Sequence, residues 1–192
     1  MQLGVMIEGQ EGLTWDRWRQ IMACVEGLGF ESLWRSDHFM SIVDANRDSL
    51  ETWVALTLTA AETTRLRFGP LVCPITFRHP SLLARMAAAV DTLSGGRLVL
   101  GLGAGWNDQE HRAFGLPFPP LQERMDRLEE GLEVITRLLR DEPARFAGRY
   151  YQLEGPNPHP KPVQRPRIPI LIGTTSERRM LRIVARYANE WD

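Results

Sequence analysis

Short apolar runs and longer stretches with helical spacing follow one another along the whole chain. The short runs carry apolar residues on both faces, as strands of a fully buried sheet do. They predict strands over 3–7, 32–34, 66–72, 98–102 and 170–172. The longer stretches repeat apolar residues with the period of a helix, which predicts helices over 15–28, 49–62, 80–94, 121–140 and 176–187.

Boundary signals agree with these ranges. Thr14 can cap the first helix, and Gly29 follows its last apolar residue. Pro80 stands at a helix start, where its missing N–H is not needed, and Gly95 ends that helix. After the fourth helix, residues 145–153 predict a small hairpin, and a proline-rich loop follows over 156–169.

The alternation of strands and helices is typical of α/β proteins with parallel strands joined by right-handed crossovers. Two architectures fit it: an open doubly wound sheet and a (β/α)8 TIM barrel. A barrel usually needs about 250 residues, and this chain has 192, with five strands and the start of a sixth at 190–192. As a barrel, the single domain over 1–192 is therefore incomplete, with about five to six βα units.

The balance of charge and the lengths of the apolar runs restrict the kinds of partner that we expect for this protein. The 23 basic side chains nearly balance the 24 acidic ones, which argues against nucleic acid or an anionic membrane as the main partner. No apolar run approaches the roughly 20 residues of a membrane span, and no basic segment precedes the first strand. We expect a cytoplasmic protein that acts on a small-molecule substrate.

The two cysteines, Cys24 and Cys73, provide neither a disulfide framework nor the spacing of a metal site. Both are interpreted as buried thiols in a reducing compartment. We expect no metal.

A glycine run at Gly101, Gly103 and Gly105 suggests a nucleotide-binding loop, but its spacing differs from the dinucleotide fingerprint G-x-G-x-x-G. Trp106 stands where the third glycine is required, and the proline-rich segment 107–120 predicts a loop instead of a helix. We therefore interpret the glycines as thinning a crowded strand end, so that a flat ligand can lie close to the backbone.

Polar side chains gather at the carboxyl ends of the predicted strands, the edge at which parallel α/β proteins bind ligands. The stretch 173–176 also opens a helix and offers backbone N–H groups and hydroxyls to an anion. One ligand with a flat ring and a phosphate could join all these positions. They are Asp37, His38, Thr76, Arg78, His79, Trp106, Asn107, Glu110, Gly173, Thr174, Thr175 and Ser176.

Several motifs in order resemble the bacterial luciferase-like monooxygenase superfamily, and most closely its branch that uses the deazaflavin coenzyme F420. They are LWRSDHF at 33–39, FRHP at 77–80, LSGGR at 93–97, LGLGAGW at 100–106, KPVQRP at 161–166 and YANEW at 187–191. The resemblance covers the whole chain. It implies a (β/α)8 barrel with a flavin or deazaflavin at the carboxyl ends of the strands.

The resemblance also implies roles for individual residues. His38 corresponds to the active-site histidine, and Asp37 orients its loop. Leu71 and Val72 match a strand bulge, often with a cis peptide, that supports the rear face of the ring, and the ring lies over the strand of Gly103. The phosphate loop corresponds to Gly173, Thr174, Thr175 and Ser176.

One position departs from the family pattern. The sugar-phosphate dehydrogenases of this group carry a catalytic glutamate where this chain has Trp106, which argues against a sugar phosphate as substrate. Glu110 is a candidate substitute. Trp34 and Trp106 fall at strand ends, where an aromatic ring can form a wall of the substrate pocket.

We expect an oxidoreductase that transfers a hydride between coenzyme F420 and a small organic substrate, with His38 as general acid or base. Three alternatives stay open: an FMN-dependent monooxygenase with a partner reductase, a truncated non-catalytic flavoprotein, and an unrelated barrel enzyme for a phosphorylated metabolite. A homodimer, or a second chain that supplies the missing strands, would complete the barrel. Arg78 either pairs with an acidic ligand or extends to solvent, and His111 is expected to be solvated.

Overall fold

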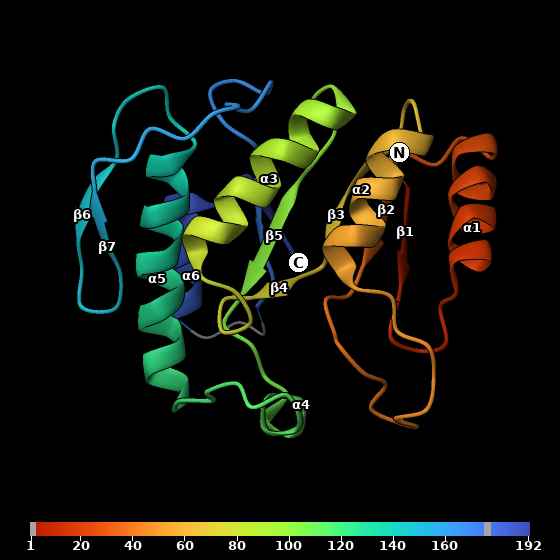
Figure 1. The fold of residues 1–192 in the computed structure, drawn as a ribbon, viewed down its shortest axis with the longest axis horizontal. Coiled ribbons are helices and arrows are strands. Elements are labelled where there is room, and N and C mark those ends of the chain that lie inside the picture. The colour runs from red at the N-terminus through yellow and green to blue at the C-terminus, as the bar shows by residue number, and fades with distance from the viewer. Residues whose placement is uncertain (1–2, 175–177) are drawn as a thin grey trace.

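The computed structural model describes residues 3–174 and 178–192, in which parallel strands alternate with helices (Figure 1). The strands are β1 (Gly4–Ile7), β2 (Ser32–Arg35), β3 (Arg67–Pro70), β4 (Cys73–Pro74), β5 (Leu100–Gly103), β6 (Arg145–Ala147), β7 (Gln152–Glu154), β8 (Ile170–Ile172) and β9 (Glu190–Trp191). The helices are α1 (Trp15–Gly27), α2 (Thr52–Glu62), α3 (Pro80–Ser94), α4 (Asp108–Ala113), α5 (Leu121–Leu138) and α6 (Arg178–Tyr187).

The parallel strands pair in the order in which they occur along the chain. One sheet has the order β1-β2-β3 and the other β4-β5-β8-β9, and a single bridge between Phe68 and Leu98 joins them. A doubly wound sheet reverses its strand order at a switch point, and the described strands have no such reversal. This order favours the barrel over the open doubly wound sheet.

The sheet also curls. Arg67 at the start of β3 forms an ion pair of 2.5 Å with Glu190 on β9, although β5 and β8 lie between them in the strand order. The described strands therefore form an arc of a barrel. The inner side of β1 is uncovered, since Met6 is 38% exposed.

The predicted strand 66–72 is interrupted in the structure. A cis peptide bond between Leu71 and Val72 separates β3 from β4. β3 pairs with β2, whereas β4 pairs with β5. The break places Leu71 and Val72 at the carboxyl end of the arc, as the family resemblance implied.

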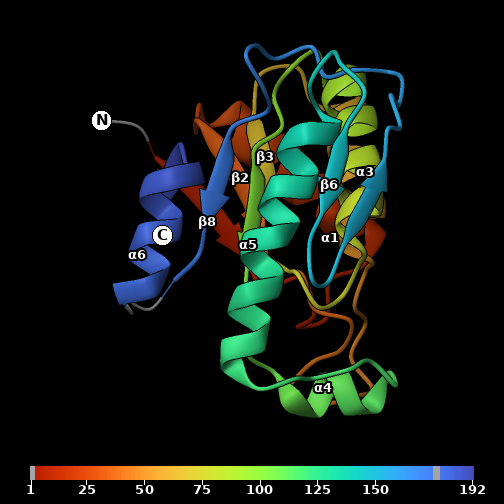
Figure 2. The same cartoon turned by 90° about the vertical axis from the view of Figure 1, so that its left-hand side faces the viewer.

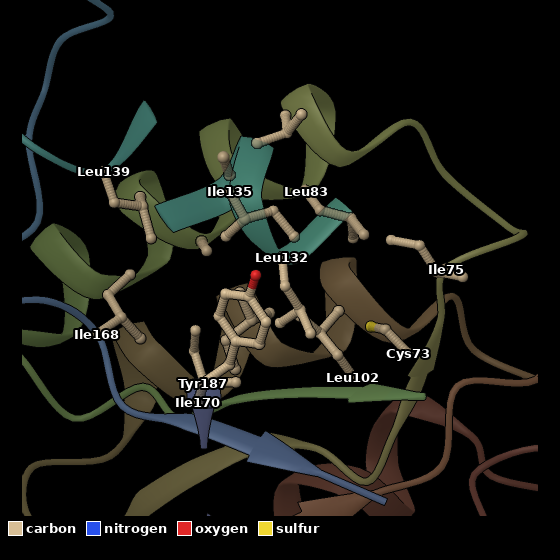
Figure 3. Close-up of a cluster of buried hydrophobic side chains, with 14 of the residues drawn as sticks. Cys73, Ile75, Leu83, Leu102, Leu132, Ile135, Leu139, Ile168, Ile170 and Tyr187 are labelled. Atoms are coloured by element: carbon tan, nitrogen blue, oxygen red, sulfur yellow. The ribbon is translucent and has the colours of Figure 1, made fainter. Parts of the chain in front are cut away.

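Helices cover the outer side of the arc, and α6 lies beside β8 (Figures 1 and 2). The main core lies between the strands and α3, α5 and α6, where side chains such as Leu83, Leu102, Leu132, Ile170 and Tyr187 meet (Figure 3). Each large aliphatic side chain buried in this way contributes about 1.5–3 kcal/mol.

A second, smaller core under α1 contains Trp18, Met22 and Leu33. Helix α2 joins the two cores, because Trp53 packs into the first and Ala55 into the second. The arc is therefore packed as one body from β1 to β8.

The antiparallel hairpin of β6 and β7 packs on α5 and covers none of the parallel strands (Figure 2). The carboxylate of Glu130 on α5 accepts hydrogen bonds from the N–H groups of Arg149, Tyr150 and Tyr151 at its turn. The hairpin is therefore fixed to the outside of the molecule, away from the carboxyl ends of the strands.

The prediction that 107–120 is only a loop was wrong. It contains the short helix α4, whose N-cap is Asn107, because the Asn107 side chain accepts a hydrogen bond from the N–H of Glu110. Figure 1 shows α4 beyond the end toward which β5 points. The prediction for the thiols was half right: Cys73 is buried, but Cys24 is exposed.

Within residues 3–174 and 178–192, none of the helices has both the length and the apolar character needed to cross a bilayer.

Candidate functional site

A cavity of about 650 Å³ opens at the carboxyl ends of the parallel strands. Most of the predicted site residues line it: Asp37, His38, Leu71, Val72, Gly103, Trp106, Gly173 and Thr174. Trp34 and Glu110 do not line it, and Thr175 and Ser176 lie outside the described residues. The carboxyl edge thus brings four strand ends and their loops to one hollow.

Each of the three glycines in the run is required for a different structural reason. At Gly101, a Cβ would lie 1.9 Å from the carbonyl oxygen of Pro70 on the neighbouring strand. At Gly103, a Cβ would lie 2.8 Å from a methyl group of Val72, and Gly105 has a φ of +83°. Gly103 therefore makes room for Val72, which forms the cavity floor, and only indirectly for a ligand.

His38 and Glu110 come together from opposite sides of the cavity rim. His38 follows β2, Glu110 lies on α4, and the His38 Nδ1 is 2.7 Å from a Glu110 carboxylate oxygen. The His38 side chain is 12% exposed and the Glu110 side chain is fully buried. Glu110 therefore does not form a pocket wall, because its carboxylate is turned toward the loop that carries His38.

The surroundings raise the pKa of His38 above its ordinary value of 6.5. Burial is the largest influence and lowers the pKa. The hydrogen bond and charge of Glu110, together with the charges of Glu8 and Asp37, raise the pKa by more than burial lowers it. The net effect of the surroundings therefore favours the protonated imidazole of His38.

Trp106 stands at the open side of the cavity. Its ring meets the His38 ring edge to face, with centroids 5.7 Å apart and planes at 74°. The residue is 64% exposed, so the apolar ring is available for contact with a ligand beside the imidazole.

Trp34 occupies a different level of the arc. Its ring lies against Gly69, where a Cβ would be 3.3 Å away, and its Nε1 donates to the Ser32 hydroxyl at 2.9 Å. The prediction of Trp34 as a pocket wall was wrong, because the ring packs against Gly69 on β3 and is not part of the cavity lining.

Asp37 is held by a buried ion pair. Two nitrogens of Arg78 donate to its two oxygens at 2.5 and 3.1 Å, and Arg78 also pairs with Glu51 at 2.5 Å. These contacts raise the pKa of Arg78 despite its burial. Neither expectation for Arg78 is right, since it binds the chain's own carboxylates and fixes the loop before His38.

Of the predicted phosphate loop, the structure describes Gly173 and Thr174, and their backbone N–H groups are less open than the sequence suggests. The N–H of Gly173 donates to Leu102 O in the strand ladder, and the N–H of Thr174 donates to Asp192 O. Both backbone groups are therefore already used. Among the described residues of this edge, the Thr174 hydroxyl is left for an anion, and a cation would have to come from elsewhere.

Arg124 supplies such a cation, and the sequence interpretation missed it. Arg124 lies in the first turns of α5, lines the cavity and is 8% exposed. Its guanidinium stacks on Phe118 at 3.9 Å, and its buried Nε has no hydrogen-bond partner among the described residues. A buried donor without a partner is unfavourable, so this arginine is suited to an anionic group of a ligand.

Helix α4 has a second anchor in His111. The His111 Nε2 lies 2.7 Å from the Thr76 hydroxyl, and its Nδ1 lies 2.6 Å from Asn107 O. The ring is fully buried between Phe77 and Phe118. The expectation that His111 is solvated was wrong, since the proline-rich segment folds it inward.

Glu8 and Gln10, after β1, also line the cavity and were missed. The Gln10 amide donates to Glu8 at 2.8 Å and its oxygen accepts from Ser36. The strand-end rule that found His38 would have found both, had it been applied to β1. Within the described residues, no group of three or more His, Cys, Asp or Glu is arranged to hold a metal ion.

Several curated proteins similar to this chain are named as F420-dependent dehydrogenases. The chain is 36% identical over 142 residues to an F420-dependent glucose-6-phosphate dehydrogenase of Kineococcus radiotolerans, covering 72% of this chain and 41% of that protein. It is 30% identical over 190 residues to an F420-dependent hydroxymycolic acid dehydrogenase of Mycobacterium tuberculosis, covering 98% of this chain and 51% of that protein. The chain thus spans about half the length of the curated relatives it matches.

Solved structures agree on the fold. An F420-dependent tetrahydromethanopterin reductase from Methanopyrus kandleri superposes with a TM-score of 0.82 at 25% identity, covering 99% of this chain and 55% of that one. An F420-dependent secondary alcohol dehydrogenase superposes with a TM-score of 0.87 at 24% identity, covering 99% and 57%. These matches confirm the incomplete luciferase-like barrel.

The family model for luciferase-like monooxygenases matches residues 1–191. The sequential parallel strands, the broken strand at Leu71 and Val72 and the cavity beside His38 all lie within that match. This chain belongs to the luciferase-like monooxygenase family.

Proposed function

We propose that this chain supplies the coenzyme-binding half of an F420-dependent oxidoreductase that transfers a hydride to or from a small organic substrate. The observation that carries the proposal is the convergence of an imidazole, a glycine-lined floor and a cationic side chain on one cavity, through His38, Gly103 and Arg124. The names of the curated relatives support the choice of coenzyme.

The residues of the cavity fit such a coenzyme. Gly103 and Gly173 leave room for the Val72 side chain, which provides the floor for a flat ring. The Nε of Arg124 is buried without a partner, which suits a phosphate oxygen. We assign the ring to the floor at Val72 and the phosphate to Arg124 and the Thr174 hydroxyl.

When bound in its oxidised form, the deazaflavin accepts a hydride from a substrate carbon. His38 takes the proton that the substrate hydroxyl loses, so an alcohol becomes a carbonyl with atoms and charge in balance. In the reverse direction His38 returns that proton. A group that titrates near neutrality serves both directions.

The substrate we propose is not a sugar phosphate. Trp106 puts an exposed apolar ring beside His38, at the position where the sugar-phosphate dehydrogenases carry a glutamate. A substrate with an apolar surface next to its hydroxyl or carbonyl group matches this wall better.

Titration of the purified protein with oxidised F420 and, separately, with FMN tests the coenzyme. We expect saturable binding of F420, read from the change in its absorbance and fluorescence, and no saturation with FMN. Saturation with FMN instead would favour the monooxygenase, and binding of neither coenzyme would reject the proposal for this chain.

Replacement of His38 tests the chemistry. We expect His38→Ala to lower turnover by about 10²- to 10⁴-fold, the usual contribution of general acid–base catalysis, with F420 affinity roughly intact. The assay follows F420 absorbance with a panel of alcohols and carbonyl compounds. Unchanged turnover in His38→Ala would end the role of this residue.

A further inference from the structure

Glu110 is a fully buried carboxylate with partners on one loop only. One oxygen lies 2.7 Å from the His38 Nδ1, and the other accepts from the N–H groups of Phe39 at 2.5 Å and Met40 at 3.4 Å. Burial of a carboxylate is costly unless its oxygens are hydrogen-bonded. Every described hydrogen bond of this carboxylate goes to the loop of the imidazole.

These contacts decide where the imidazole carries its proton. A carboxylate accepts hydrogen bonds, so the His38 Nδ1 must be the donor. The neutral ring then keeps its lone pair on Nε2, which has no hydrogen-bond partner among the described residues, while the ring lines the cavity. His38 is therefore prepared to accept a proton from the cavity side.

Attachment of α4 does not require this carboxylate. The helix is already held by His111, which contacts Thr76, and its first turn is capped by Asn107. A residue that served only to fix the helix would not need to place a buried charge against an imidazole.

We propose that Glu110 is the positioning residue of His38: it fixes the proton on Nδ1, directs Nε2 into the cavity and stabilises the imidazolium that forms when Nε2 takes a proton. This inference rests on the proposed function, because it gives the protonation of His38 a role in the reaction.

The charges that face His38 come from three places. They are Glu110 on α4, Glu8 after β1, and Asp37 on the same loop, whose carboxylate is already paired with Arg78. Of the carboxylates in the described part of the chain, Glu110 alone is hydrogen-bonded to the imidazole. Variants can therefore separate the effect of that bond from the effect of nearby charge.

Glu110→Gln is the central test, because the amide has the shape of the carboxylate but offers a hydrogen-bond donor to His38 in place of an acceptor. The Phe39 N–H still needs an acceptor, so the amide oxygen faces Phe39 and the amide NH2 faces the His38 Nδ1. The neutral imidazole must then carry its proton on Nε2. Nitrogen-detected NMR of the imidazole groups, over a pH series, measures both the tautomer and the midpoint of titration.

In the wild type we expect the Nδ1–H tautomer. In Glu110→Gln we expect the Nε2–H tautomer, a midpoint below that of the wild type and turnover lowered about 10- to 100-fold, part of what acid–base catalysis supplies. The loss should fall on kcat and on the pH profile, with KM and F420 affinity nearly unchanged, since Glu110 does not line the cavity.

Two variants serve as controls. Asp108→Asn removes a carboxylate from the same helix, where Asp108 is exposed and paired with Arg112, and should leave the His38 tautomer and midpoint as in the wild type. Glu8→Gln removes a charge without a hydrogen bond to the ring, so the midpoint should fall while the Nδ1–H tautomer persists.

A wild-type His38 with its neutral proton on Nε2 would overturn the proposal, and this measurement needs no variant to fold. An unchanged tautomer and midpoint in a folded Glu110→Gln protein would overturn it as well. The F420 titration of the wild type reports on the proposed function alone, whereas the imidazole signals report on Glu110 alone, so the two failures are distinguishable.

Discussion

The charged side chains at two walls of the cavity differ in whether they have partners within the chain. At the carboxyl end of β2, the Asp37 carboxylate in the wall is paired with Arg78, and the Glu110 carboxylate, which does not line the cavity, is hydrogen-bonded to the loop of His38. On the side of β8 and α5, Arg124 is 8% exposed, and its Nε has no hydrogen-bond partner among the described residues. The carboxylates at β2 are thus paired within the chain, whereas the Arg124 Nε has no partner among the described residues.

This difference indicates that one wall positions the acid–base group and that the other binds the ligand. Paired charges hold a loop in one conformation, which an acid–base group requires. A buried donor without a partner is favourable only when a ligand supplies the acceptor. We therefore interpret the β2 wall as the side that handles the proton and the α5 wall as the side that holds the coenzyme's anion.

We expect the largest loss of stability from Arg78→Met, which removes the arginine of the Asp37–Arg78 ion pair on the β2 wall. The variant leaves the Asp37 carboxylate buried without its partner, because the Asp37 side chain has no exposed surface and that of Arg78 only 9%. Removing one member of a buried pair costs about 3–5 kcal/mol of unfolding free energy. Urea unfolding, with the midpoint and slope fitted together, measures the loss.

Arg112→Met is the matched control for that variant. Arg112 pairs with Asp108 at 2.6 Å, but its side chain is 74% exposed, and exposed pairs contribute about 0.2–1 kcal/mol. Equal losses in the two variants would mean that the Asp37–Arg78 pair is not desolvated, and the contrast between the walls would then be invalid.

Arg124→Met tests the α5 wall, where the Arg124 Nε has no partner among the described residues. It should have the next largest effect, on the affinity for F420. A hydrogen bond to a charged group contributes about 1.5–3 kcal/mol, so the Kd for F420 should rise about 10- to 100-fold. Unfolding free energy should stay the same or increase, because the unpartnered Nε is removed. Coenzyme titration and urea unfolding of the same preparation measure both.

Arg127→Met is the control on the same helix. Arg127 already pairs with Glu123 at 2.7 Å and is not part of the cavity lining, so the Kd for F420 should not change. A Kd for Arg124→Met that equals the wild-type value would show that the free guanidinium does not hold the coenzyme.

The fold could be predicted further from the sequence than the site could. The strands and most helices follow from apolar periodicity, since burial on both faces leaves a clear pattern, as in 98–102. Periodicity did not reveal α4, because this helix is short and its proline-rich surroundings are typical of a loop. It also gave no sign of the interruption between β3 and β4, which only the family resemblance implied.

The candidate site shows the limit of the rule that predicts functional residues from the carboxyl ends of strands. That rule found His38 and Glu110 but not their contact, since residues 38 and 110 come from different loops that only tertiary packing joins. Arg124 follows no strand, and its sequence context does not set it apart from Arg127 and Arg137 on the same helix, which are only half-buried. Its burial depends on Phe118, which covers it from the preceding loop.

The smallest expected effect is a pH dependence of stability, because it depends on the pKa shift of a single group. The folded protein raises the pKa of His38 through Glu110 and the neighbouring carboxylates, against the opposing effect of burial. Protonated His38 therefore stabilises the fold fully below the ordinary pKa of 6.5, and this contribution disappears as the pH rises through the folded pKa.

The measurement is the difference in unfolding free energy between wild type and His38→Gln, taken at steps from about pH 5.5 to pH 8.5 around the ordinary pKa. We expect the wild type to lose its advantage as the pH increases. The same series with Arg124→Met should give a flat difference, because a guanidinium does not titrate in this range. A flat difference for His38, or one that grows with pH, would mean that the imidazole is not stabilised as a cation, and the β2 wall would then not differ from the α5 wall in handling protons.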